Sequence, residues 1–252
     1  MPDIPSDDRV SHIPPFARRP VEPFSRAAVV AIALREWRLF GQYIIDYSGG
    51  PADEKPERAQ GLWQRVGEYW WLGLNRDAPE AGWTGRHDAD GNVFPPEQDG
   101  DFAWSAAFVS YVFRIAGAGS AFPYAADHAV YIDAAKRMTL GLDRGWLLIA
   151  ERPESYAPVS GDLICHGRNW AAPMRYDDLP AGKLFPAHCD IVVDTSRTGT
   201  IAVIGGNIRD TVALRHIPAA PDCRLALPDG TMLDQAQTWF AVLRISDGIV
   251  PA

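Results

Sequence analysis

Three polar residues stand at the ends of predicted elements and could together perform nucleophilic chemistry. Ser105 begins a predicted helix, His188 lies at the start of the run from Ala187 to Val193, and Asn207 closes the run from Ile201 to Asn207. A hydroxyl, an imidazole and an amide form a candidate triad: the hydroxyl attacks, the imidazole accepts its proton, and the amide orients the imidazole. The elements that carry them must therefore bring these three ends together.

The helix that would carry Ser105 is predicted by its apolar spacing. Phe108, Val112 and Ile115 recur at steps of four and three residues, and Gly117 ends the pattern. A side chain in the first helical turn lies near N–H groups without intrahelical acceptors, which could stabilise an oxyanion. The alternative is purely structural, because Ser at a helix start is commonly a cap. In the same structural alternative, His188 is a histidine at a strand edge and Asn207 is a turn residue.

Composition restricts the class of protein. The 252 residues suit one large domain or a domain with an appendage, and 47% hydrophobic residues can form a core. The net charge of −8 argues against nucleic-acid binding, which requires clustered Lys and Arg. No apolar run reaches the length of a transmembrane span. The first residues lack a basic and then apolar signal peptide.

The order of predicted elements indicates an α+β fold. Residues 1–24 contain six prolines and form an irregular arm. Residues 25–75 form a helical pair, from Ser25 to about Tyr47 and from Glu57 to Leu74, packed on the main domain. Residues 76–252 form the main domain: a long loop to residue 100, the Ser105 helix, a shorter helix within 122–135, and then strands near 163–165, 188–193, 200–204, 211–217 and 239–245.

Cysteine spacing predicts no zinc site, and the three cysteines cannot all pair within one chain. Cys165 ends one predicted strand and Cys189 begins another. The sequence is therefore compatible with a disulfide between them and also with two free thiols. Cys189 follows His188 within a strand and therefore points to the opposite face.

The order of the motifs W-S-A-A-F-V (from Trp104), G-D-L-I (from Gly161), H-C-D-I-V-V (from His188) and I-G-G-N (from Ile204) resembles the CHAP and NlpC-type branch of papain-like amidases. The resemblance covers about residues 60–217. With V-G-E-Y-W upstream and a segment from Phe122 to Ile132, the chain looks like a serine-bearing, uncharacterised bacterial branch. It implies a papain-like α+β fold with the nucleophile helix on an antiparallel sheet.

The resemblance assigns the catalytic roles residue by residue. Ser105 matches the nucleophilic cysteine, His188 the general base and Asn207 the residue that orients the imidazole. The departure is serine in place of cysteine: a hydroxyl does not ionise as a thiol does, and it needs the base to take its proton during attack. A carboxylate behind the imidazole would help, and Asp162 and Asp190 are the candidates, although a turn cap and a sheet position are the simpler roles for them.

Four further residues are predicted to contact substrate. Arg168 could bind a carboxylate through its guanidinium group, and Trp104, Tyr124 and His128 could line the same cleft. Packing and surface ion pairs are the alternatives.

We therefore expect a hydrolase of the amidase or peptidase type that acts on cell-wall peptides or a related amide or ester, without a metal or organic cofactor. One alternative is a catalytically silent relative that binds peptidoglycan or a partner protein. Another is an acyltransferase or esterase on the same scaffold. The resemblance implies the bacterial envelope or periplasm as the location, with the cytoplasm left open. Oligomeric state does not follow from these residues.

Overall fold

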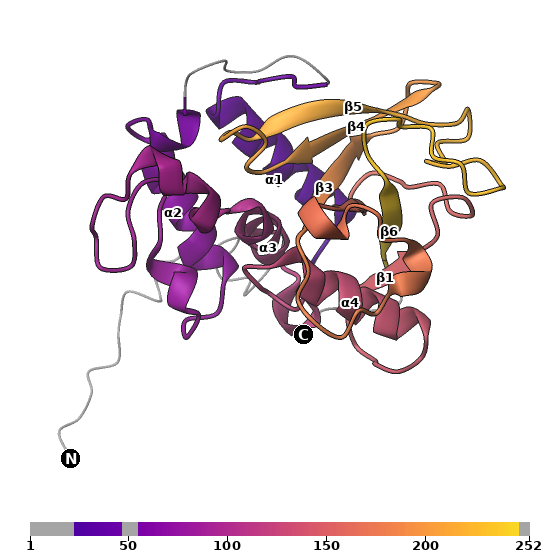
Figure 1. The fold of residues 1–252 in the computed structure, drawn as a ribbon, viewed down its shortest axis with the longest axis horizontal. Coiled ribbons are helices and arrows are strands. Elements are labelled where there is room, and N and C mark those ends of the chain that lie inside the picture. The colour runs from indigo at the N-terminus through magenta and orange to yellow at the C-terminus, as the bar shows by residue number, and fades with distance from the viewer. Residues whose placement is uncertain (1–22, 47–54, 247–252) are drawn as a thin grey trace, which may run out of the picture.

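The computed structural model describes residues 23–46 and 55–246, which form the predicted α+β fold around an open six-stranded antiparallel sheet (Figure 1). The proline-rich arm predicted for residues 1–24 lies almost entirely outside these residues. The α-helices are α1 (Arg26–Leu39), α2 (Leu62–Gly73), α3 (Ser105–Ile115) and α4 (His128–Thr139). The strands are β1 (Leu148–Glu151), β2 (Leu163–Gly167), β3 (Ala187–Asp194), β4 (Thr200–Gly205), β5 (Ala213–Pro218) and β6 (Trp239–Ile245).

The sheet follows the order β1-β6-β2-β3-β4-β5. From β2 to β5 each strand pairs with the next along the chain, as short turns between antiparallel strands favour. The last strand, β6, inserts between β1 and β2. The edge strand β1 was not predicted, because Leu148–Glu151 is only four residues long and its sequence, Leu-Ile-Ala-Glu, does not alternate apolar and polar residues.

The boundaries of α1, α2 and α4 differ from the sequence prediction. Helix α2 was expected from Glu57 but begins at Leu62, after a separate 3-10 turn over Pro56–Arg58. Helix α1 was expected to reach about Tyr47, but it ends at Leu39. Gly41 adopts a φ of 99°, which is incompatible with a right-handed helix. Ile44 then forms a parallel bridge with Leu214 beside β5. Helix α4 begins at His128, after the Asp127 carboxylate caps the Ala129 N–H at 2.8 Å.

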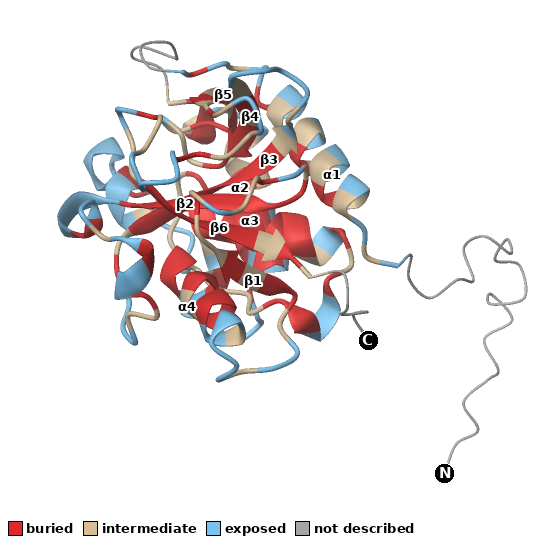
Figure 2. Ribbon diagram, turned by 90° about the vertical axis from the view of Figure 1, so that its right-hand side faces the viewer, coloured by how far each residue is buried: buried red, intermediate tan, exposed pale blue. Residues whose placement is uncertain are grey.

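Helix α3 lies at the centre of the molecule (Figures 1 and 2). Every residue from Ser105 to Phe113 is buried, with α2 on one side and the strands β3 and β4 on another. Helix α1 also packs on α3, β3 and β4, so the N-terminal helices share one hydrophobic core with α3. A buried carboxylate, Glu36, links α1 to this core by accepting hydrogen bonds from Tyr69 and Arg65 of α2. The first residue of α3 is thereby fixed by packing on several sides.

A disulfide joins the central strands. Cys165 on β2 and Cys189 on β3 are directly opposite each other in the antiparallel register, with Cα atoms 4.2 Å apart, and they form a disulfide bond. This resolves the pairing that the sequence left open, and Cys223 keeps a free thiol. The bridge therefore ties the strand that carries His188 to its neighbour.

Among the helices of the described ranges, none combines the length and the apolar content that crossing a bilayer would require.

Candidate active site

Ser105 lies at the edge of a cleft of about 620 Å³, at the point where α3 begins. Trp104 precedes the helix, so Ser105 occupies its first turn, and Ser105 is 4% exposed. The first N–H groups of the helix have no intrahelical acceptors and carry the positive end of the helix dipole. The cleft is lined by Asp99, Gly100, Ala103, Ser105, Ala126, Asp127, His128, Arg168, Asn169, Pro186, Ala187, Asn207, Arg209 and Asp210.

The imidazole that contacts Ser105 belongs to His128, the first residue of α4. Its Nε2 atom lies 2.8 Å from the Ser105 Oγ. Its Nδ1 atom hydrogen bonds the phenol of Tyr131, one helical turn further along α4. Burial, the neighbouring His188 and Arg168 lower the pKa of His128 well below 6.5. His128 is therefore neutral at pH 7, as its place at a helix N-terminus also favours.

A second imidazole, His188, is held by a carboxylate and lies beside the first. Its ring centroid is 5.2 Å from that of His128, and its Nε2 atom is 2.9 Å from Oδ1 of Asp190. The guanidinium of Arg215 on β5 bonds the other oxygen of Asp190. Burial alone would raise the pKa of Asp190, but Arg215 and His188 outweigh it and hold that pKa far below 3.8. Asp190 is therefore an anion, and the hydrogen bond that its Oδ1 accepts from Nε2 of His188 fixes the imidazole.

A third imidazole closes this side of the site. His166 on β2 is paired with His188 on β3, and their ring centroids are 5.5 Å apart. Its Nδ1 atom donates to the Gly167 carbonyl at 3.0 Å, and its ring packs against Trp239. Burial lowers the pKa of His166 to about 3, and burial likewise lowers the pKa of His188. The site therefore contains three buried, neutral histidines at pH 7.

The predicted triad is brought together only in part. Ser105, His128, Arg168 and Asn207 all line or enter the cleft. The position behind His188 that was predicted for Asn207 is occupied by Asp190, whereas Asn207 lies in a turn with a φ of 56° and lines the cleft. Asp162 lies elsewhere: it accepts from Tyr156, Val159 and Ile245 and pairs with Arg26.

Two residues predicted to bind substrate pack within the core or against it instead. Trp104 is 1% exposed, packs against Phe40 and Tyr69, and donates its Nε1–H to Glu57. Tyr124 lies beneath the guanidinium of Arg114, 3.6 Å from its ring centroid, and packs on Phe122. Neither lines the cleft, because their large rings bury more apolar surface inside the fold than in an open cleft.

Tyr131 and Arg215 were not assigned to the site from the sequence, and Asp190 was given a sheet position as the simpler role. The spacing of His188 and Asp190 puts both side chains on one face of a strand, and that of His128 and Tyr131 puts both on one helix face. These patterns could have identified both pairs. Nothing in the sequence pointed to Arg215, because its contact with Asp190 depends on how β3, β4 and β5 pair.

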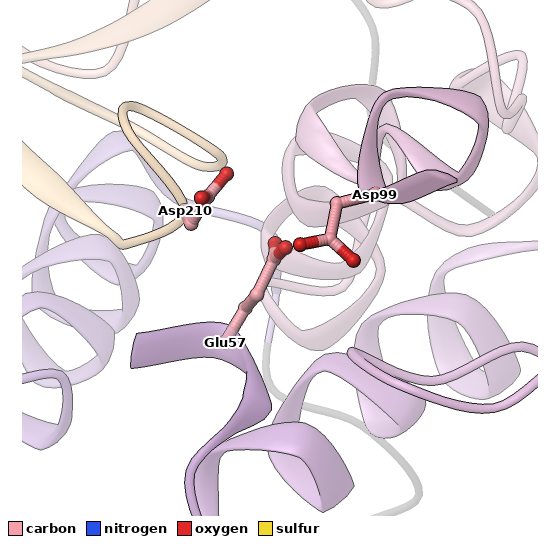
Figure 3. Close-up of side chains that lie close together, drawn as sticks. All are labelled: Glu57, Asp99 and Asp210. Carbon is pink, nitrogen blue, oxygen red and sulfur yellow. The ribbon is translucent and has the colours of Figure 1, made fainter. Parts of the chain in front are cut away.

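Three carboxylates form the one group in the described residues that could hold a metal ion. Glu57, Asp99 and Asp210 offer oxygen atoms within 4.8 Å of one another (Figure 3). Their contacts also have an explanation within the protein: Asp99 pairs with Lys55 and Arg58, and Glu57 accepts from Trp104. Burial, together with Asp210 and Asp99, raises the pKa of Glu57 to about 8. Glu57 therefore keeps a proton at pH 7 and reduces repulsion within the cluster.

Comparison with protein families gives one match. A family described as "uncharacterized protein conserved in bacteria (DUF2272)" matches residues 57–245. The chain belongs to this family. The DUF2272 match spans α2, α3, α4 and every strand of the described sheet, and so includes Ser105, His128, His188 and Asp190. Neither the curated proteins nor the solved structures give a match to the chain.

Proposed function

We propose that this DUF2272 protein is an acyl-transfer hydrolase of the amidase or peptidase type, with Ser105 as its nucleophile. The observation that carries the proposal is the hydrogen bond between Ser105 Oγ, at the start of α3, and the imidazole of His128, next to a second imidazole held by Asp190. A hydroxyl at a helix N-terminus, a neutral imidazole and an ionised carboxylate are the groups that nucleophilic serine catalysis uses. We further propose that the fold is papain-like, since a helix carrying the nucleophile packs on an antiparallel sheet carrying the histidine.

The reaction would proceed through an acyl-enzyme. Ser105 Oγ attacks the carbonyl carbon of an amide or ester, an imidazole takes the hydroxyl proton, and the amine or alcohol leaves with that proton. The backbone N–H groups at the start of α3 are positioned to stabilise the oxyanion. Water then attacks the ester and releases the acid, restoring Ser105.

Cell-wall peptides are the substrate class that we propose. Arg168 is exposed at the cleft and offers a guanidinium for a substrate carboxylate. The buried disulfide supports an oxidising compartment such as the bacterial envelope, because cytosolic thiols are generally kept reduced. The cleft also contains Asp127 and Asp210, which suits a substrate bearing an amine as well as a carboxylate.

A binding protein without catalysis is the second candidate, and one observation favours it. Nδ1 of His188, the atom expected to accept the Ser105 proton, is buried and has no hydrogen-bond partner in the described structure. A resting enzyme often shows long catalytic contacts that shorten when substrate binds. A His188 Nδ1 atom without a partner is also expected in a cleft that binds peptides and leaves them intact.

A serine-reactive fluorophosphonate separates the two candidates. Intact-mass spectrometry of the treated protein should show one adduct, which disappears in Ser105→Ala. Ser105→Cys is the matched variant, because it restores the thiol found in the resembling amidases. No adduct on the wild type, together with rapid thiol labelling of Ser105→Cys, would contradict the enzyme and support the binding protein.

A further inference from the structure

We propose that the two imidazoles at Ser105 have opposite roles: His188 accepts the serine proton, whereas His128 donates an N–H hydrogen bond to Ser105 Oγ. This inference rests on the proposed function of Ser105 and assigns a catalytic role to His128, a residue that the resemblance to papain-like amidases does not provide. It follows from where the hydrogen atoms of the two rings must lie.

The hydrogen on His188 is fixed by Asp190. An ionised carboxylate can only accept hydrogen bonds, so Nε2 of His188 must carry the hydrogen in the 2.9 Å contact with Oδ1. Arg215 keeps Asp190 ionised by bonding its other oxygen. A neutral imidazole has one N–H, and Nδ1 of His188 is therefore an unprotonated acceptor. This acceptor is buried and lacks a partner, in a ring 5.2 Å from that of His128.

The hydrogen on His128 is fixed by Tyr131. The phenol is 0% exposed, and His128 Nδ1 is its hydrogen-bond partner within the described residues. If Nδ1 carried the hydrogen, the phenol O–H would be buried without an acceptor, which costs about 1–3 kcal/mol. With the phenol donating to Nδ1, the ring hydrogen lies on Nε2 and points to Ser105 Oγ at 2.8 Å. The serine hydrogen is then the free one, and Ser105 lines the cleft, where water can accept it.

This arrangement determines the proton path. His128 Nε2 already carries a hydrogen and cannot accept another from Ser105. The serine proton therefore passes to His188 Nδ1, directly or through one water, while Oγ forms its bond to the carbonyl carbon. The N–H of His128 stabilises the negative charge that develops on Oγ as the proton leaves. In the second half of the reaction the same N–H stabilises Oγ as it leaves the acyl group. Tyr131 is a positioning residue, since it acts through His128.

The hydrogen positions can be measured on the wild-type protein without any substrate. In protein labelled with ¹⁵N-histidine, long-range ¹H–¹⁵N correlation spectra distinguish protonated from unprotonated ring nitrogens. At pH 7 we expect the Nε2–H tautomer for both His128 and His188, assigned by comparison with His128→Gln and His188→Gln. An Nδ1–H tautomer at His128 would overturn the proposal, whether or not Ser105 is reactive. In Tyr131→Phe the donor to Nδ1 is lost, and His128 should shift toward the Nδ1–H tautomer; an unchanged tautomer would contradict the role of Tyr131.

Rates of fluorophosphonate labelling then test the roles with matched amide variants. Gln keeps an N–H donor but cannot act as a base, so His188→Gln should slow labelling by about 10³-fold. His128→Gln should slow it by about tenfold or less, whereas His128→Ala, which removes the donor, should slow it by about 10²-fold. A larger loss in His128→Gln than in His188→Gln would make His128 the base and overturn the proposal. If the wild type is not labelled while both Nε2–H tautomers are found, the proposed hydrolase fails and this catalytic role fails with it, although the hydrogen assignment stands.

Discussion

Gly205 on β4 lies directly against the carboxylate of Asp190 on β3. A Cβ atom at Gly205 would be 1.9 Å from Oδ1 of Asp190 and 3.0 Å from Nε2 of His188. The backbone φ of Gly205 is not in the left-handed region, so glycine is required here for space. The pair of side chains that fixes His188 can thus exist only because the neighbouring strand has no side chain at this position.

Gly205→Ala should therefore disable the site. The added methyl group must displace Asp190 from His188, and the imidazole then loses the anion that fixes its hydrogen. We expect fluorophosphonate labelling of Ser105 to slow by about 10²-fold or more, as for loss of an orienting group in a triad. Labelling kinetics followed by intact-mass spectrometry measure the effect.

Gly206→Ala is the comparison variant. Its Cβ would come within 2.6 Å of the Phe108 side chain in the core, and the three atoms nearest to it all belong to Phe108. It should lower thermal stability more than it alters the His188–Asp190 pair. Equal labelling rates for Gly205→Ala and the wild type would show that Asp190 has no role in activating Ser105.

The disulfide should contribute to stability. Closing a loop between residues 24 positions apart restricts the unfolded chain, which is worth about 3 kcal/mol. Denaturant unfolding of Cys165→Ala/Cys189→Ala should therefore show a lower free energy of unfolding than the wild type by about that amount. Cys223→Ala is the matched control and should change stability little, since Cys223 is only partly buried. Thiol titration of the unfolded, unreduced protein should find one thiol, and three would contradict the bridge.

Stability should decrease below about pH 6.5 because His128, His166 and His188 are buried. Burial lowers the pKa of each histidine, so between the folded and the unfolded pKa the unfolded chain binds more protons, and acid favours unfolding. For His166, whose pKa is about 3, the loss at pH 5 is about 2 kcal/mol. Urea unfolding at pH 7 and pH 5 measures this difference.

His166→Phe keeps a ring against Trp239 and removes one of the three titrating groups. Its loss of stability between pH 7 and pH 5 should be smaller than that of the wild type. Identical losses would mean that His166 titrates normally in the folded chain.

Asp190 affects stability in a lower pH range than the histidines. The pKa of Asp190 is depressed, so its stabilisation is present above about pH 4 and is lost as the pH falls through the folded pKa.

Glu57 should have the opposite pH dependence. Burial raises the pKa of Glu57 to about 8, so the folded chain holds a proton that the unfolded chain releases above pH 4.5, and stability falls as the pH rises to about 8. Glu57→Gln replaces the protonated acid with a neutral amide that can still accept from Trp104. We expect this variant to gain stability relative to the wild type between pH 6 and pH 9, measured by thermal unfolding. A stability difference that does not change with pH would contradict the raised pKa.

Arg168 should discriminate between substrates. For peptides with a free carboxylate, Arg168→Gln should lower kcat/KM by about 10-fold or more, the value of a charge-assisted hydrogen bond. Amidated versions of the same peptides should be affected little. Arg197→Gln, in the exposed turn after the far end of β3, is the matched control for the loss of one positive charge. Equal effects on both kinds of peptide would exclude a carboxylate contact.

The sequence by itself determined much of the local structure. The spacing of Phe108 and Val112 defined α3 and placed Ser105 in its first turn, because apolar residues on the buried face of a helix recur every three or four positions. Short apolar runs rich in β-branched residues, with turn residues between them, located β2 to β6. The opposite directions of His188 and Cys189 followed from the same rule. The short edge strand β1 was missed because four residues carry too little pattern.

The tertiary structure decided which side chains meet. Trp104 precedes the nucleophile, yet its indole belongs to the core, because a large ring is stabilised more by burial than by a place at the cleft. The choice of Asp190 over Asn207 behind His188 depends on the space left by Gly205, and the ionised state of Asp190 depends on Arg215 two strands away. The contact of His128 with Ser105 joins the starts of two helices. Spacing along one element fixes local geometry, whereas contacts between elements depend on packing that no single segment encodes.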